Sequence, residues 1–78
     1  MPRRRITFRQ LETFSAVARL HSFSRAAEEL HLTQPAVSIQ IRQIAETIGL
    51  PLFEQNGREI ALTAAGQEML ATVRELED

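Results

Sequence analysis

The 78-residue sequence has no cysteine, which excludes disulfide bonds and any metal site built on thiolates. No apolar run approaches the length of a membrane span, and the first residues, MPRRRITF, lack the apolar stretch of a signal peptide. A glycine-rich phosphate loop, a plausible Ser/His/Asp set and a metal-binding cluster are also missing, so no residues support catalysis or a cofactor. We therefore expect a cytoplasmic, non-enzymatic protein without cofactor or metal.

The charge of the chain is unevenly distributed. Its formal net charge of −1 is unusual for a protein that binds nucleic acid. However, residues 1–44 carry seven arginines against three glutamates, whereas residues 45–78 carry two arginines against seven acidic residues. The acidic C-terminal part can point away from DNA, so the net charge does not exclude DNA binding.

A chain of this length forms one small domain, or a piece of a longer protein.

Residues 23–48, FSRAAEELHLTQPAVSIQIRQIAETI, indicate two short helices joined by a tight turn. Ser24 is a candidate N-cap of the first helix, and Thr33 of the second, with Pro35 in its first turn. The inner face of the first helix is then Phe23, Ala27 and Leu30. An apolar stripe at spacings of four, three and four runs along the second helix, at Val37, Ile41, Ile44 and Ile48.

The spacing of three residues in this segment resembles the helix-turn-helix of DNA-binding proteins. A small residue, a turn and a buried branched residue stand at Ala27, His31 and Val37. The turn position is usually glycine, so His31 must adopt a strained φ or a different turn. The alternatives are an ordinary hairpin of two helices and a module whose second helix binds a protein. The outward face of residues 34–42 is polar apart from one isoleucine, which favours DNA over a protein groove.

The first helix is predicted from Thr7 to Leu20, with a capping box formed by Thr7 and Gln10. We interpret it as a support packed under the next two helices. Its expected apolar face consists of Phe8, Leu11, Phe14, Val17 and Ala18. Before it, residues 1–5 form a short basic arm, which either contacts phosphate or is an idle terminus.

A hairpin is predicted after the second motif helix, which ends at Gly49. In residues 52–63, LFEQNGREIALT, the pair Asn56-Gly57 between extended segments is a strong hairpin signal. A two-stranded ribbon at this place is a wing, with Arg58 beside its tip. Arg58 is then either a solvated turn residue or a side chain that enters the minor groove of DNA.

Thr63 is expected to cap a last helix from Ala64 to about Glu77, in which Gly66 would allow close approach to another backbone. The apolar stripe of this helix consists of Ala65, Met69, Leu70, Val73 and Leu76. Because so small a domain is not expected to bury this stripe, we predict that it meets a second copy of itself or a domain outside this chain. The chain ends without a stop signal, so we expect the helix to continue.

Over roughly residues 6–70 the chain resembles the N-terminal domain of LysR-type transcriptional regulators. The resemblance is carried by FRQLETFSAVARLHSFSRAAEELHLTQPAVSIQIRQI and by GLPLFEQNGREIALTAAG. It implies a mainly α fold: a winged helix-turn-helix in residues 1–62, with a three-helix core and a two-stranded wing, and a linker and dimerisation helix in residues 63–78. The forms TQPAVSIQIRQ and GLPLFEQ are most similar to regulators of Calvin-cycle carbon-fixation genes.

The resemblance also implies sequence-specific binding of double-stranded DNA at an inverted-repeat operator, by a homodimer that becomes a tetramer in the full-length protein. The residues implied to contact bases are Gln34, Pro35, Ser38, Ile39 and Arg42 in the major groove and Arg58 in the minor groove. The residues implied to contact phosphates are Ser22, Ser24, Arg25, Thr33, Gln40 and Gln43. Ile39 departs from the family, in which many members have arginine or another polar residue.

Overall fold

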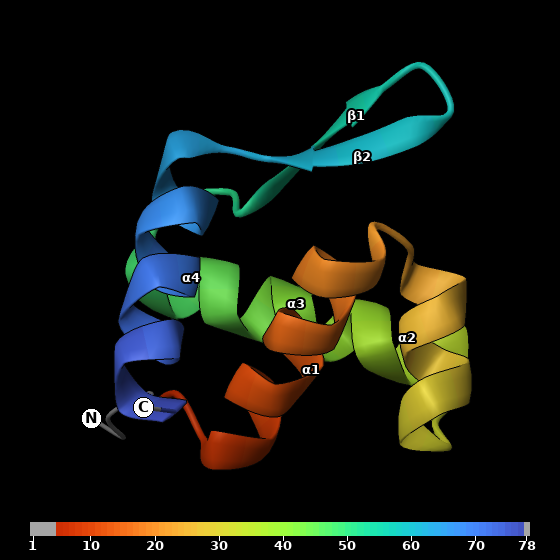
Figure 1. The fold of residues 1–78 in the computed structure, drawn as a ribbon, viewed down its shortest axis with the longest axis horizontal. Coiled ribbons are helices and arrows are strands. Elements are labelled where there is room, and N and C mark those ends of the chain that lie inside the picture. Colours follow the sequence, from red (N-terminus) through yellow and green to blue (C-terminus); the bar gives the residue numbers. More distant parts are fainter. Residues whose placement is uncertain (1–4, 78) are drawn as a thin grey trace.

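The chain forms four helices and one two-stranded antiparallel sheet in a computed structural model that describes residues 5–77. The elements are α1 (Phe8–Leu20), α2 (Phe23–Leu30), α3 (Gln34–Ile48), β1 (Phe53–Asn56), β2 (Glu59–Leu62) and α4 (Ala64–Glu77). In Figure 1, α1 crosses in front of α3, with α2 at one end of the molecule and α4 at the other. Residues 1–4 of the predicted basic arm lie outside the described residues.

The hydrophobic core lies where α1, α2 and α3 meet. Three of the four predicted apolar residues of α3 belong to it, and the small side chains of Ala26 and Ala27 are buried on α2. The full set is Phe14, Ala16, Val17, Ala26, Ala27, Val37, Ile41, Ile44, Leu52 and Val73. The ring of Phe53 at the start of β1 lies 5.5 Å from that of Phe14 and 5.8 Å from that of Phe23, between ring centroids. These contacts hold the sheet against α1 and α2.

Helices α1 and α3 have the N-caps that the sequence predicts, Thr7 and Thr33. In the capping box of α1, Gln10 N donates to Thr7 Oγ1 (3.1 Å) and Thr7 N donates to Gln10 Oε1 (2.9 Å). In α3, Ala36 N donates to Thr33 Oγ1 (3.2 Å). These bonds satisfy backbone N–H groups that have no partner within the helix.

The prediction that Ser24 caps α2 is wrong, because the helix begins at Phe23. Ser22 is the N-cap: its backbone is extended (φ −160°, ψ 127°) and its Oγ accepts a hydrogen bond from Arg25 N at 3.1 Å. The preceding residue, His21, ends α1 in the left-handed conformation (φ 53°). The chain therefore leaves α1 and enters α2 two residues earlier than a cap at Ser24 would require.

The predicted apolar faces are correct near the middle of the helices and wrong at two of their ends. Phe8, expected to face the core, is 77% exposed at the first position of α1, whereas Thr13 and Ala16 are buried. Ile48, expected to continue the stripe of α3, is 37% exposed because the last turn of the helix extends past the core. Both residues line surface cavities bordered by α4.

The turn between α2 and α3 follows the first of the two alternatives left open by the sequence, a strained backbone at His31. His31 is left-handed, with φ 59° and ψ 40°, and its backbone N–H donates to Glu28 O at 3.3 Å. Leu32 N donates to Ala27 O at 2.9 Å, which closes the end of α2. A residue with a Cβ atom adopts this conformation at a cost of about 1 kcal/mol, which glycine avoids.

Substituting His31→Gly is therefore expected to raise the free energy of unfolding by about 0.5–1 kcal/mol, since it removes left-handed strain at the cost of a more flexible unfolded chain. Urea unfolding followed by circular dichroism measures the change. His31→Ala is the matched control, because alanine also loses the imidazole and keeps the strain. An equal effect of the two substitutions would show that the backbone at this turn is not strained.

The wing is a short antiparallel ribbon in which Phe53 pairs with Leu62 and Asn56 with Glu59. This register makes Gly57 and Arg58 the two loop residues, so the predicted hairpin is confirmed but its turn lies one residue later than Asn56-Gly57. Gly57 has φ 63°, as a tight two-residue hairpin requires at its first loop position. Arg58 consequently lies at the tip and not beside it.

The start of α4 is attached to the segment before the wing. Thr63 caps the helix as predicted: Gly66 N donates to Thr63 Oγ1 (3.1 Å), and the threonine hydroxyl donates to Pro51 O (2.6 Å). Thr63 N donates to Leu52 O at 3.0 Å. The predicted close approach at Gly66 is confirmed, because a Cβ atom there would lie 2.2 Å from Leu52 O.

The expectation that the domain cannot bury the stripe of α4 is wrong in part. Val73 is only 5% exposed and belongs to the core, and Met69 and Leu70 pack against that core from its edge. Leu76, one turn further on, is 71% exposed. Thus α1 already covers the middle of the stripe.

Within residues 5–77, no helix is long and apolar enough to span a membrane.

Candidate nucleic-acid interface

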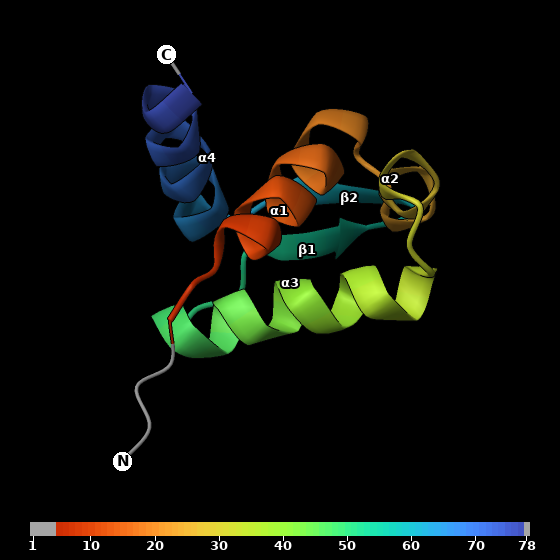
Figure 2. The same ribbon diagram turned by 90° about the horizontal axis from the view of Figure 1, so that it is seen from below.

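Among residues 5–77, no other helix or strand covers the outer side of α3. Figure 2 shows α3 as the outermost layer of the domain, with α1 and the ribbon on its inner side. Pro35, Ile39 and Arg42 lie on the side away from the buried stripe, and all three are exposed. Gln34 is exposed at the first position of the helix, and Ser38 is half-buried on its flank. The five residues predicted for the major groove therefore form one accessible surface, which we call the outward face.

Two capping hydroxyl groups stand at the starts of α2 and α3. Ser22 Oγ and Thr33 Oγ1 each accept a backbone N–H, which leaves the hydroxyl proton of each for an external acceptor. Ser24 and Arg25 are exposed in the first turn of α2. Since helix N-termini also favour anions, these residues form a surface suited to phosphate oxygen atoms.

Three exposed arginines lie around this surface. Between residues that the structure describes, the one salt bridge joins Arg19 of α1 to Glu29 of α2. Arg25, Arg42 and Arg58 are exposed and have no such partner within that part of the chain. Their guanidinium groups stay available for bidentate contacts with phosphate or guanine.

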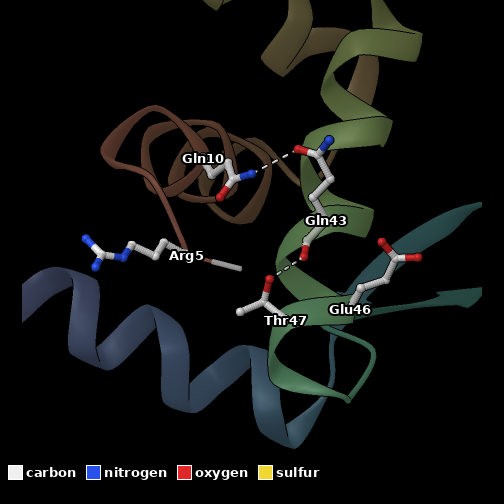
Figure 3. A pocket seen from close by; sticks show the side chains of 5 residues that line it. All are labelled: Arg5, Gln10, Gln43, Glu46 and Thr47. Carbon is white, nitrogen blue, oxygen red and sulfur yellow. Dashed lines mark hydrogen bonds between the residues drawn. The ribbon is translucent and has the colours of Figure 1, made fainter. Parts of the chain in front are cut away.

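Gln40 and Gln43, which are predicted to contact phosphate, each accept a hydrogen bond from α1. Gln10 Nε2 donates to Gln43 Oε1 at 2.9 Å, and Figure 3 shows Gln43 turned toward α1 beside a polar cavity of about 360 Å³. Gln40 Oε1 lies 2.7 Å from Oγ1 of Thr13, which sequence reasoning did not single out. The sequence signal for Thr13 was a polar residue at a position of α1 that faces the core. In both bonds the glutamine accepts through Oε1, so the Nε2–H donors that a phosphate would need take no part in them, and the phosphate contacts stay a prediction.

The wing places Arg58 away from the helical core. The tip of the ribbon lies toward the end of the molecule where α2 and the start of α3 are found, as Figures 1 and 2 agree. Gln55 Nε2 donates to Gly57 O at 3.3 Å, which braces the loop. Sequence reasoning missed Phe53 as the anchor of this ribbon, although the Leu52-Phe53 pair before the hairpin was its signal.

Comparison with known proteins assigns the family. Residues 8–67 match the family of bacterial regulatory helix-turn-helix proteins described as the lysR family. The chain belongs to the LysR family. This LysR-family domain superposes on a crystal structure of the CbnR DBD in complex with DNA, with a TM-score of 0.83 and 38% identity. The superposition covers 90% of this chain and 80% of the other.

Sequence relatives of this LysR-family domain include a RuBisCO operon regulator. It is 56% identical over 75 residues to a RuBisCO operon transcriptional regulator of Acidithiobacillus ferrooxidans, covering 96% of this chain and 24% of that protein. It is 62% identical over 66 residues to the HTH-type transcriptional regulator CbbR of Rhodospirillum rubrum, covering 85% of this chain and 22% of that protein. The predicted subgroup similarity is confirmed. The chain spans about a quarter of the length of these relatives.

Two exposed apolar patches of the LysR-family domain lie on either side of α4. One is a cavity of about 150 Å³ against α1, lined in part by Phe8, Leu11 and Leu76. The other faces the end of α3 and is lined by Ile48, Leu50, Ala65, Glu68, Met69, Ala71 and Thr72. The predicted dimer residues thus divide between two surfaces. Val73 lines the first cavity but is only 5% exposed, and Leu70 lines neither cavity.

Proposed function

We infer that this chain is the sequence-specific DNA-binding domain of a LysR-type transcriptional regulator, with α3 in the major groove and the wing in the minor groove. The observation that carries this function is the outward face of α3, which is accessible, mostly polar and includes Arg42, an arginine without a salt bridge to another residue of the range 5–77. A B-DNA major groove accommodates one α-helix, and polar side chains on its outer side then reach the base edges. The family and the likeness to a DNA-bound DBD support the same function.

The roles of the residues follow from their positions. The outward face, Gln34, Pro35, Ser38, Ile39 and Arg42, contacts bases. Phosphate contacts come from Ser22, Ser24, Arg25 and Thr33, whose hydroxyl and guanidinium donors surround the two helix starts. Gln40 and Gln43 accept hydrogen bonds from α1 through Oε1, and their Nε2–H groups contact phosphate.

A homodimer presents two such faces to an inverted repeat with half-sites about one helical turn apart. The linker helix α4, capped by Thr63, pairs the copies through Ala65, Met69, Leu70 and Leu76. The half-exposed or exposed state of these side chains in the single chain supports this role, and Leu76 has the most surface to bury. In a full-length regulator, two dimers form a tetramer.

The regulator controls carbon-fixation genes, acts in the cytoplasm on nucleoid DNA and is not an enzyme. The names of the relatives, which are transcriptional regulators and in part RuBisCO operon regulators, support this role.

The experiment that tests sequence-specific DNA binding is a selection of duplexes from a random pool with this chain, followed by fluorescence anisotropy titrations. We expect the selected inverted repeat to bind much more tightly than the same duplex with one half-site scrambled. Equal, salt-insensitive binding of both would contradict the proposed function.

Arg58→Ala is expected to weaken binding and to reduce the slope of the log binding constant against log salt concentration by about one, because one positive charge that displaces counterions from DNA is lost. The loss is also expected to be larger on A·T-rich flanks, where a narrow minor groove attracts arginine. Titrations at several salt concentrations measure the slope. Glu59→Gln, the adjacent exposed residue, leaves the arginine in place and serves as a control. An unchanged slope and affinity for Arg58→Ala would mean that the tip stays in solvent.

A further inference from the structure

Ile39 is an exposed isoleucine in the middle of the outward face of α3, 49% exposed. Successive residues of an α-helix are rotated by about 100°, so Ile39 lies about 200° from both Val37 and Ile41. Those two residues are buried in the core. Ile39 therefore points away from the core, and the fold of residues 5–77 leaves much of its surface uncovered.

The other large exposed apolar residues gather elsewhere. Phe8 and Leu76 line the cavity between α1 and α4, and Ile48 and Leu50 line the one between α3 and α4. Ile39 belongs to neither cavity, and its neighbours one turn away on the same face are Pro35 and Arg42. A partner that covers both Ile39 and Arg42 would therefore offer an apolar group close to an anion or another hydrogen-bond acceptor.

The major groove of DNA offers this combination at thymine. Thymine alone among the four bases carries a 5-methyl group in the major groove, close to phosphates and hydrogen-bonding base edges. The side chain of isoleucine has no hydrogen-bonding group, and its branched Cβ holds it in one preferred rotamer on a helix. We propose that Ile39 packs on the 5-methyl group of one thymine in each half-site and makes thymine the preferred base there. This inference rests on the proposed placement of α3 in the major groove.

Deoxyuridine substitution tests the contact without changing a hydrogen bond. In the duplex selected by this chain, each thymine of a half-site is replaced in turn by deoxyuridine, which lacks only the 5-methyl group. We expect one position at which the wild-type protein loses about fourfold in affinity, the contribution of one buried methyl-sized group. Ile39→Ala is expected to bind the two duplexes with nearly equal affinity at that position.

Two further variants make the result specific. Ile39→Val keeps a branched apolar side chain and should keep most of the deoxyuridine effect. Ile48→Ala removes the same atoms from the other exposed isoleucine of α3 and should leave the affinity ratio of the two duplexes unchanged. The inference is overturned if no thymine position responds in the wild-type protein, or if the loss at the responding position persists in Ile39→Ala.

The same titrations separate this inference from the proposed function. Each protein is also measured on the unmodified duplex and on one with a scrambled half-site. If the wild-type protein prefers the unmodified duplex but ignores deoxyuridine, the domain reads DNA and the role of Ile39 is wrong. If it has no preference for the unmodified duplex, DNA reading itself fails and the inference fails with it.

Discussion

Substitution of Gly66 by alanine is expected to lower the free energy of unfolding by about 2–3 kcal/mol, through a clash at the start of α4. The added Cβ atom would lie 2.2 Å from the carbonyl oxygen of Leu52 and 2.8 Å from Cδ2 of Leu62. The side chain of Leu62 can move, but the carbonyl of Leu52 accepts a hydrogen bond from Thr63 N and belongs to a buried residue. The helix can accept the methyl group only by moving away from this segment.

Thermal or urea unfolding measures the effect, which in a domain of this size corresponds to a decrease in Tm of about 10 °C or more. Gln67→Ala is the matched control, because the neighbouring residue is exposed on the same helix and alanine suits a helix. The two substitutions should differ clearly. If Gly66→Ala unfolds at the same temperature as Gln67→Ala, α4 does not approach the Leu52 backbone as closely as the structure has it.

Arg42→Ala is expected to weaken binding to the selected duplex by about tenfold to a hundredfold, the range for loss of one bidentate contact. Arg42 is exposed on the outward face, one turn beyond Ile39, and has no salt-bridge partner among the described residues. If it contacts a base, the preference for the selected over a scrambled duplex falls as well. If it contacts phosphate, both duplexes lose affinity together and the salt slope decreases by about one.

Arg74→Ala provides the control for this measurement. It removes the same side chain and the same charge from the last turn of α4, away from the outward face. Any loss common to the two variants reflects net charge, and the excess loss in Arg42→Ala reflects position. Unchanged affinity of Arg42→Ala for both selected and scrambled duplexes would place Arg42 outside the interface.

The elements that could be predicted from the sequence depend on interactions within a few residues. The capping box of Thr7 and Gln10 and the cap at Thr33 each close between residues three apart, so they can be identified from sequence alone. The cap of α2 shows the limit of such signals. Ser22 and Ser24 are equally good N-cap residues, and the left-handed end of α1 at His21 decides between them.

What could not be predicted depends on where each helix lies against its neighbours. Phe8 and Ile48 fit the helical stripes yet extend past the core, whereas Val73 is covered by an α1–α4 contact between residues far apart in sequence. Periodicity indicates that a helix has a polar side, but not whether another helix covers its flank, as α1 does at Gln40. The outward face was predicted because it is polar and has no role in the core, and its ligand was inferred from the family.

An amide NMR titration of this chain with the selected duplex tests the central claim, that α3 and the wing form the DNA-binding surface. The account predicts that chemical-shift changes and intermolecular contacts concentrate at residues 22–25, at residues 33–42 and at Gly57 and Arg58. Changes confined to the apolar cavities beside α4, around Phe8, Leu50 and Leu76, with the outward face of α3 unperturbed, would contradict it.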